Sequence, residues 1–344
     1  MKKNWTSFLA ILLIVFAITG CTQTKSSSNG SSRSPIILVW YPNESGDDFR
    51  TTREGFAEII EQATGRPTEH ILTTDYVISI EAISQGNAHF ALMGAEGYIQ
   101  ANRRNPKVLP LFVNSNSNSL DEAVYYSWLT VNKENKTEHQ KAGSYVIDNI
   151  QGKRFSFVSA SSTSGFRVPS SSIVSYFSSQ SQWSSLVAED LIEGGSNRFF
   201  SEVLFGGSHQ GALFNLLNGS CDVASVCDVC VSHYIELVEG VHNTPGAVYR
   251  IKADAEEPFD RVRGEEFVII SSTPVLNAPF VINTEVLTKE EQQKMLAAFI
   301  AEETMDNEKI FPGKDAAHFS FYKKGERFLP VTDDWFDPIR RLSQ

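Results

Sequence analysis

The sequence predicts an α/β protein with two domains, and three observations lead to this prediction. The chain has 344 residues, 41% of them hydrophobic, which is enough to bury two cores. Short apolar runs bounded by turn-forming residues alternate with segments of helical periodicity. A long extended aromatic stretch, residues 122–131, is followed by a polar segment and then by a second strand and helix series. We expect one series in each domain, with mostly parallel sheets.

The first series begins with an apolar run at residues 35–41, which is typical of a buried strand. A helix is expected over residues 51–63, because Phe56, Ile59 and Ile60 recur at helical spacing. The series continues with expected strands at 70–74, 89–93 and 108–113 and expected helices at 76–85 and 95–102.

The second series comprises expected strands at 153–158, 199–205 and 222–226 and expected helices at 169–177 and 210–217. A further apolar strand at 267–279 and a helix at 288–303 then return to the first domain. The first domain is therefore expected to be discontinuous, with residues 35–128 and 276–344 in lobe 1 and 129–275 in lobe 2.

The N-terminus has the pattern of an export signal. Lys2 and Lys3 precede an apolar run at residues 8–18, which is too short to span a membrane comfortably. Ile18-Thr-Gly-Cys21 resembles the lipobox of bacterial lipoproteins, which implies a signal peptide at 1–20 and lipidation, such as palmitate, at Cys21. The alternative is an ordinary signal peptide followed by an unrelated cysteine. With a serine-rich tether over 21–34, the protein is expected to be anchored to the extracytoplasmic face of a bacterial membrane.

The charge and the cysteine content limit the classes of function that the chain can have. The formal net charge is −11, which argues against nucleic-acid binding, and removal of residues 1–20 makes it more negative. An exported chain can oxidise Cys227 and Cys230, leaving Cys221 unpaired. Alternatively Cys221 and Cys227 are small buried strand residues, and a redox role for the Cys227 and Cys230 pair stays open. Zinc binding with His233 matches ligand spacing only weakly.

The segment FSFVSASSTSGFRVP, residues 155–169, runs from a strand into a turn rich in hydroxyl groups. Ser162, Thr163 and Ser164 lie where the strand ends and a helix begins, and this position suits an anion site that needs no lysine. Gly165 allows a positive φ or a close backbone approach. Helix capping by the same hydroxyl groups is the alternative, and the two roles are compatible.

Two further residues lie where ligands bind in α/β sheets. His209 follows the expected strand at 199–205, and Asp228 follows the expected strand at 222–226. The alternative interpretation is that His209 is a structural histidine and that Asp228 is a solvated acid of a loop. Ser208 lacks the flanking glycines of a hydrolase nucleophile.

Segments along most of the chain are similar, in order, to one family: the phosphate, phosphite and phosphonate ABC-transporter substrate-binding proteins. They are Trp40-Tyr-Pro-Asn-Glu44, residues 54–67, 75–86, 89–94 and 152–158, Ser162-Thr-Ser-Gly165 with Pro169, Gly207-Ser-His209, and residues 218–224 and 272–279. The chain departs from the family pattern at residues 94–98 and in its Cys227 and Cys230 pair.

The resemblance implies a type II periplasmic-binding-protein fold, with two α/β lobes, a hinge and a ligand cleft between them. It implies capture of a phosphonate, phosphite or phosphate by lobe closure and delivery to ABC permease subunits with a cytoplasmic ATPase. No enzymatic activity, cofactor or metal is expected. The implied ligand-binding residues are Ser162, Thr163, Ser164 and His209, with Tyr41 or Tyr98 from the other lobe and an acid near Asp222 or Asp228.

Three other functions stay open at this point. Aromatic and acidic residues of the chain would suit a thiamine-like cation: Trp40, Tyr41, Tyr76, Tyr98, Glu96 and Asp228. A sensory binding lobe without a transport role is the second alternative. An exported redox or hydrolytic enzyme, acting through Cys227 or Ser208, is the third.

Overall fold

The computed structural model describes residues 34–314 and 316–342. The predicted signal peptide, the lipidation site at Cys21 and all of the predicted tether except Ser34 lie outside the described residues. Within the described residues, no helix is both long enough and apolar enough to cross a membrane.

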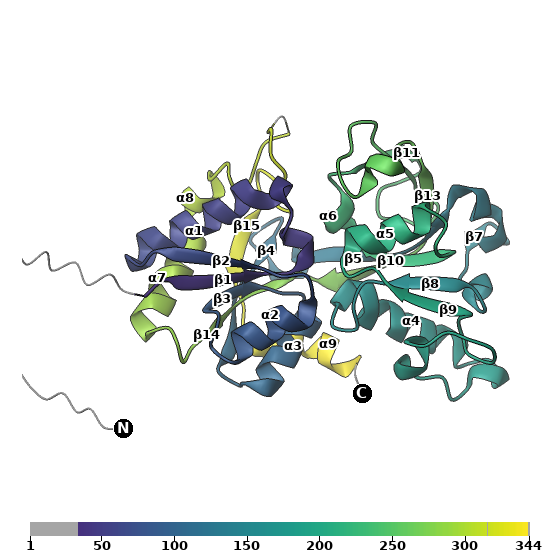
Figure 1. The fold of residues 1–344 in the computed structure, drawn as a ribbon, viewed down its shortest axis with the longest axis horizontal. Helices are drawn as coiled ribbons and strands as arrows, with labels where there is room; N and C mark the ends of the chain where they lie inside the picture. The colour runs from purple at the N-terminus through teal and green to yellow at the C-terminus, as the bar shows by residue number, and fades with distance from the viewer. Residues whose placement is uncertain (1–33, 315, 343–344) are drawn as a thin grey trace, which may run out of the picture. The chain divides into compact units, whose positions relative to one another are not determined.

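Two large sheets organise the described chain (Figure 1). The first has the order β15 (Arg327–Pro330), β4 (Val108–Ser115), β14 (Pro279–Asn283), β3 (Phe90–Leu92), β1 (Ile36–Trp40), β2 (Thr68–Leu72). The second has the order β11 (Ile235–Glu239), β12 (Val248–Ile251), β13 (Glu266–Leu276), β5 (Val124–Asn132), β10 (Val223–Cys227), β8 (Arg154–Phe157), β9 (Glu202–Phe205). A small hairpin joins β6 (Gln140–Lys141) to β7 (Ser144–Tyr145). We call each large sheet with its helices a lobe, numbered 1 and 2.

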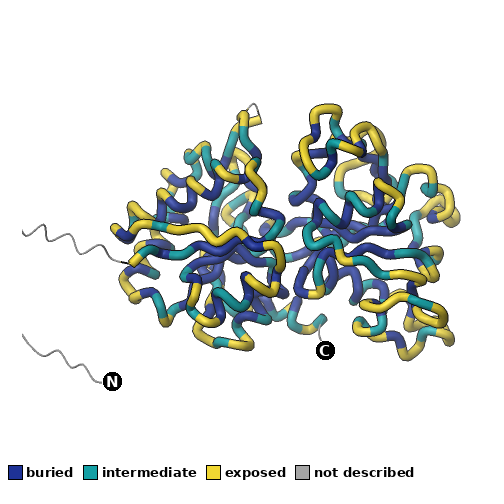
Figure 2. Tube along the Cα trace, in the orientation of Figure 1, coloured by how far each residue is buried: buried dark blue, intermediate teal, exposed yellow. Residues whose placement is uncertain are grey.

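Successive strand residues point to opposite faces of a sheet, and the inner strands β1 and β3 are buried on both faces. Phe90 and Leu92 of β3 pack in one apolar cluster, whereas Ala91 packs in another. The first cluster receives α1 (Arg50–Thr64) and α7 (Lys289–Phe299). The second receives α2 (Tyr76–Ser84), α3 (Ala95–Arg104) and α9 (Asp337–Arg341). Figure 2 shows the central strands of each lobe as buried, whereas the edge strand β2 is mostly exposed.

Helices also cover the second sheet. The face that includes Phe155 and Phe157 packs against α4 (Val168–Phe177). The opposite face packs against α5 (His209–Leu217) and the short α6 (Asp228–Val231). The helices α4, α5 and α6 follow the parallel strands β8, β9 and β10, so they begin near the same edge of the sheet.

Two long neighbouring strands connect the lobes. β5 and β13 pair antiparallel from Phe267 with Asn132 to Leu276 with Val124. β13 is followed within three residues by β14 of the first sheet. The predicted boundary between residues 128 and 129 falls inside β5, and the boundary between 275 and 276 falls at the last residue of β13. The exact lobe limits stay a prediction.

The prediction of mostly parallel sheets is wrong. In the two large sheets as described, parallel pairing is confined to β1 with β2 and β3, and to β8 with β9 and β10. Parallel neighbours need a crossover connection, usually a helix, and only part of the chain supplies one. β14 enters from the other lobe and pairs antiparallel with β3 and β4.

The single helix expected at 288–303 is two helices. α7 ends at Phe299 and α8 (Glu302–Met305) begins three residues later. Thr288 caps α7 in a capping box with Glu291, which accounts for the start of the helix.

Aromatic packing dominates the core between the first sheet, α1 and α7. Phe56 lies at its centre, with its ring centroid 4.7 Å from that of Phe280 and 5.6 Å from that of Phe299. Aromatic pairs in such arrangements add to the free energy gained by burying their area. We therefore expect this cluster to contribute strongly to the stability of lobe 1.

Replacement of Phe56 by alanine is expected to lower the free energy of unfolding by about 3–5 kcal/mol, because it leaves a cavity in this cluster. Chemical denaturation followed by far-UV circular dichroism measures the change. Val241→Ala is the matched control, because Val241 is 68% exposed and its truncation should change stability by less than about 0.5 kcal/mol. Equal effects of the two substitutions on the free energy of unfolding would contradict a central role of Phe56 in the core of lobe 1.

Candidate functional site

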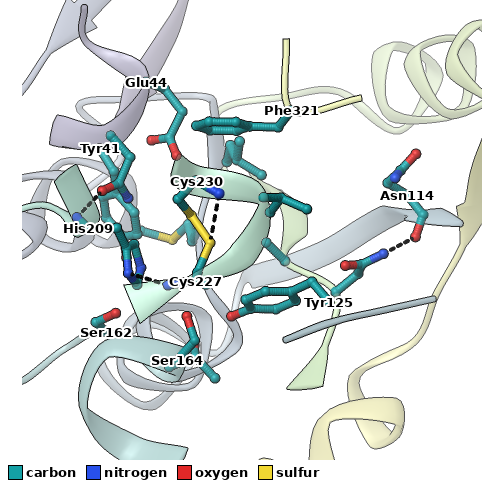
Figure 3. Close-up of a pocket in the computed structure, with 18 of the residues that line it drawn as sticks. Tyr41, Glu44, Asn114, Tyr125, Ser162, Ser164, His209, Cys227, Cys230 and Phe321 are labelled. Atoms are coloured by element: carbon teal, nitrogen blue, oxygen red, sulfur yellow. Dashed lines mark hydrogen bonds between the residues drawn. A yellow bond between two sulfur atoms is a disulfide. The ribbon is translucent and has the colours of Figure 1, made fainter. Parts of the chain in front are cut away.

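A cavity of about 90 Å³ lies between the two lobes, where several strands end (Figure 3). Lobe 1 contributes the residues that follow β1 and β3, and lobe 2 contributes those that follow β8 and β10. This is the edge at which open α/β sheets bind ligands. The polar and sulfur-containing residues that line it include Tyr41, Asn43, Glu44, Tyr76, Asn114, Tyr125, Ser162, Thr163, Ser164, His209, Cys227 and Cys230.

The hydroxyl-rich turn lines the cavity and also begins a helix. Ser162 is the N-cap, and its Oγ accepts a hydrogen bond of 3.1 Å from the Gly165 N–H. A π-helical turn, η6 (Thr163–Arg167), follows and continues directly into α4. The first N–H groups of a helix have no partner within it and are available to an anion. Capping and anion binding are thus compatible in this turn.

Gly165 is needed for close packing. A Cβ atom at this position would lie 2.4 Å from the side chain of Val158, closer than real Cβ contacts. The Gly165 N–H is held by Ser162, and its carbonyl oxygen accepts a hydrogen bond of 2.8 Å from Ser225 Oγ. The turn is therefore fixed against β10.

His209 presents a neutral hydrogen-bond donor. It is the first residue of α5 and is 3% exposed. Its Nδ1 accepts a hydrogen bond of 3.0 Å from the Cys227 N–H, so the neutral ring carries its proton on Nε2. Burial lowers the pKa of His209 to about 3, which keeps the ring neutral at physiological pH.

Tyr41 and Tyr76 form an aromatic wall from lobe 1. Their ring centroids lie 4.1 Å apart, and Asn43 Nδ2 donates a hydrogen bond of 2.7 Å to the Tyr76 hydroxyl. The Tyr41 hydroxyl is buried without a hydrogen-bond partner in the described protein. Burial raises the pKa of Tyr41 well above its ordinary value, so the hydroxyl stays protonated.

Glu44 is the unexpected residue of the cavity. Its side chain is buried, and Oε2 has no hydrogen-bond partner among the described residues. The described residues that line the cavity include no lysine or arginine. Burial raises the pKa of Glu44 to about 8. Glu44 belongs to the motif Trp40–Glu44, which predicted no role for it; its place in the turn after a buried strand was the available signal.

The two cysteines of the cavity form a disulfide. Cys227 and Cys230 are bonded, with their Cα atoms 5.4 Å apart, and the Cys230 N–H donates to Cys227 Sγ. Cys221 is a free, buried thiol. His209, rather than His233, is the histidine that lies beside the disulfide. The same turn that holds the disulfide also positions His209 through the Cys227 N–H.

Several residues singled out from the sequence do not reach the cavity. The Tyr98 hydroxyl donates to Asp333, and its ring packs on Phe336. Asp228 accepts hydrogen bonds from the Tyr126 N–H at 2.9 Å and from Asn243 Nδ2 at 3.2 Å. Asp222 pairs with Arg154 at 2.7 Å. These groups are engaged within their own lobes.

The aromatic cage considered for a cation is not assembled. Trp40 lies in the core of lobe 1, where its Nε1 donates a hydrogen bond of 2.9 Å to His70. Glu96 forms an ion pair with Arg167 at 3.1 Å. Of the four aromatic residues considered, only Tyr41 and Tyr76 line the cavity.

Direct contacts between the lobes surround the cavity. The Glu96 N–H donates a hydrogen bond of 2.9 Å to Thr163 Oγ1, and Arg167 pairs with the Glu96 carboxylate. The His209 N–H donates a hydrogen bond of 3.0 Å to Asn43 Oδ1. The cavity residues Thr163, Asn43 and His209 thus also join the lobes.

The family described as ABC transporter, phosphonate, periplasmic substrate-binding protein matches residues 38–336. A curated relative, the phosphate-import protein PhnD of Mycolicibacterium smegmatis, is 24% identical over 232 residues. That match covers 67% of this chain and 66% of the relative, just under two thirds of its length.

Two solved structures share the fold. The binding protein component of an ABC phosphonate transporter from Pseudomonas aeruginosa matches with a TM-score of 0.60 and 18% identity, over 90% of this chain and 85% of that chain. PhnD1 from Prochlorococcus marinus, solved in complex with methylphosphonate, matches with a TM-score of 0.61 and 14% identity, over 90% and 96%. At these identities the likeness shows a fold of the two-lobed periplasmic-binding-protein type.

Reduction of the disulfide is expected to lower the free energy of unfolding by about 2 kcal/mol, because the unfolded chain loses a short loop constraint. Denaturant titration with and without dithiothreitol measures the change. The double variant Cys227→Ser with Cys230→Ser is the control and should not respond to dithiothreitol. An equal response in both proteins would show that the reductant acts elsewhere.

Proposed function

We propose that this chain, which belongs to the family of periplasmic substrate-binding proteins of phosphonate ABC transporters, captures a small phosphorus oxyanion for import. Phosphonate, phosphite and phosphate are the candidate ligands. The observation that carries the proposal is the convergence of the Ser162–Ser164 turn and the neutral His209 ring on one buried cavity.

The donors of this cavity suit an oxyanion that has been stripped of water. Ser162, Thr163 and Ser164 offer hydroxyl groups and the N–H groups of a helix start, where the helix dipole also favours negative charge. His209 adds a neutral N–H donor. Hydrogen bonds from neutral donors to a charged oxygen are stronger than those between neutral groups.

The size of the cavity favours a small ligand. Its volume of about 90 Å³ is well below the roughly 300–1,000 Å³ of sites for drug-sized molecules. A thiamine-like cation would need a larger aromatic site, and Trp40 and Tyr98 are directed elsewhere. A phosphorus oxyanion with at most a short substituent is the better match.

Lobe closure is the proposed mechanism of capture. The Ser162–Ser164 turn and His209 would hold the oxyanion on lobe 2, and Tyr41 and Asn43 would then close over it from lobe 1. The contacts of Thr163 with Glu96 and of His209 with Asn43 would stabilise the closed state, while β5 and β13 act as the hinge. Ligand binding shifts the equilibrium only through such contacts made in the closed state.

The partners follow from the family. The closed protein would deliver its ligand to permease subunits driven by a cytoplasmic ATPase, on the extracytoplasmic side of the membrane. We further propose a lipid anchor at Cys21, on the lipobox-like sequence before it, and a binding role without catalysis.

Phosphite, phosphate, methylphosphonate or 2-aminoethylphosphonate is expected to raise the melting temperature, because a ligand at 100 times its Kd adds about 2.7 kcal/mol of stability. A thermal shift panel, with thiamine and sulfate as comparison ligands, measures this. A shift with thiamine and none with any phosphorus oxyanion would overturn the proposal.

His209→Asn is expected to weaken oxyanion binding by about 10- to 150-fold, the equivalent of one hydrogen bond to a charged group, about 1.5–3 kcal/mol. Asparagine can still accept from the Cys227 N–H but lacks a donor at the Nε2 position. Titration calorimetry measures the loss. Tyr98→Phe is the matched control outside the cavity and should change affinity less than about twofold. Unchanged affinity in His209→Asn would remove His209 from the site.

A further inference from the structure

Glu44 has a position that the binding of an anion does not by itself explain. It ends the short helical turn Pro42–Glu44 after β1, is 4% exposed and lines the cavity. Its Oε2 is buried without a hydrogen-bond partner among the described residues. Figure 3 draws Glu44 above the disulfide, with Ser162 and Ser164 below it. A carboxyl group therefore shares the cavity with the proposed oxyanion donors.

Hydrogen bonds from the Asn43 side chain and from the backbone of Tyr41 and Glu44 favour an ionised Glu44, as does the charge of Arg53, but burial outweighs them. Arg53 of α1 is the nearest cation, but its guanidinium donates to the backbone carbonyl oxygens of Glu44 and Gly46. That guanidinium also faces Asp47 and Asp48. The remaining titratable groups that face Glu44 are Tyr41, Tyr76 of α2, Tyr322 of the C-terminal segment and the neutral His209 of α5.

An ionised Glu44 and a bound oxyanion would repel each other strongly, because a buried cavity screens charge poorly. A neutral carboxylic acid has the opposite effect, since it gains an O–H donor. Burial alone already favours the neutral form, with a pKa of about 8 before any ligand binds. The bound anion would raise that pKa further.

We propose that Glu44 binds the oxyanion as a neutral carboxylic acid, donating a hydrogen bond from its carboxyl O–H, so that ligand and one proton occupy the cavity together. This inference rests on the proposed function and adds the charge state that the site accepts. Glu44 thereby acts as a specificity-determining residue: it favours an anion with a free acceptor oxygen facing lobe 1.

The affinity for the oxyanion should therefore depend on pH, and it should fall as the pH rises. Below pH 8, Glu44 of the free protein is already protonated, and binding requires no proton uptake at this residue. Above pH 8, Glu44 of the free protein is ionised and must take up a proton when the dianion binds. Affinity for a dianion should therefore fall about tenfold for each pH unit above this range.

The test is titration calorimetry at pH 9 in two buffers of different ionisation enthalpy, which counts the protons taken up. Phosphite, phosphate and methylphosphonate are the probes, because all three are dianions at this pH. The wild-type protein should take up close to one proton for each ligand bound, and Glu44→Gln close to none. Glu44→Gln should also bind more tightly than the wild type at pH 9, since glutamine is a permanent neutral donor.

Asp228→Asn is the matched control, because Asp228 is a buried acid with a raised pKa that lies outside the cavity. It should take up the same proton as the wild type. Binding without proton uptake by the wild type would overturn the role of Glu44 and leave the proposed function intact. This outcome does not depend on whether Glu44→Gln folds. No binding of any probe at pH 7 or 9 would contradict the proposed function itself.

The ligand-free protein offers a second readout. A carboxyl group whose pKa rises from 4.5 to about 8 on folding stabilises the fold fully below pH 4.5 and loses that contribution as pH rises to 8. The melting temperature of Glu44→Gln minus that of the wild type should therefore increase between pH 5 and pH 8. A constant difference over this range would contradict a protonated Glu44.

Discussion

An anion in this cavity has to be held without a cationic side chain, because no lysine or arginine is among the described residues that line it. Such a site depends on neutral donors whose directions are fixed before the ligand arrives. The hydrogen bond from the Cys227 N–H to His209 Nδ1 supplies this for His209, since it selects the tautomer with a proton on Nε2. The N-cap of Ser162 on Gly165 does the same for the turn at the start of η6. The hydrogen bonds that hold these groups in the fold therefore also orient them toward the proposed ligand.

The disulfide belongs to this arrangement. Cys227 ends β10 and Cys230 lies in α6, so the disulfide ties the end of the strand to the helix, and the Cys227 N–H is the donor to His209. A disulfide at this position restricts the backbone whose displacement would redirect His209, the proposed donor to the ligand. An exported protein can keep such a bond, because its surroundings are oxidising.

Local patterns in the sequence were sufficient for most strands and helices and for part of the site. Ser162, Thr163, Ser164, Tyr41 and His209 all line the cavity, because each follows a strand or begins a helix at one edge of a sheet. Tyr98 satisfies a similar local description, yet its hydroxyl contacts Asp333, which is 235 residues away in the chain. The direction of a side chain around a helix depends on such distant partners.

Contacts between segments far apart in the chain also explain why the strand pairing and some of the cavity residues were not predicted. The prediction of mostly parallel sheets failed in lobe 1 because β14 returns from the other lobe and inserts antiparallel beside β3. It failed in lobe 2 because β5 pairs antiparallel with both β10 and β13. No local pattern of these strands indicates their partners. Phe321 and Tyr322 reach the cavity from the C-terminal segment, where sequence alone suggested no element. Glu44 is the case in which a local signal existed, since it is an acid in the turn that follows a buried strand, where burial of a charge is costly.

The central claim is that a neutral, correctly oriented His209 donor holds an oxyanion in a cavity without lysine or arginine. Nitrogen-15 NMR of the histidine side chains, recorded between pH 5 and 8 with and without methylphosphonate, tests it most directly. We predict that Nε2 of His209 stays protonated and Nδ1 stays unprotonated over this range, and that the ligand shifts the Nε2–H resonance. A His209 imidazolium, the Nδ1–H tautomer, or no response of Nε2–H to bound methylphosphonate would contradict it.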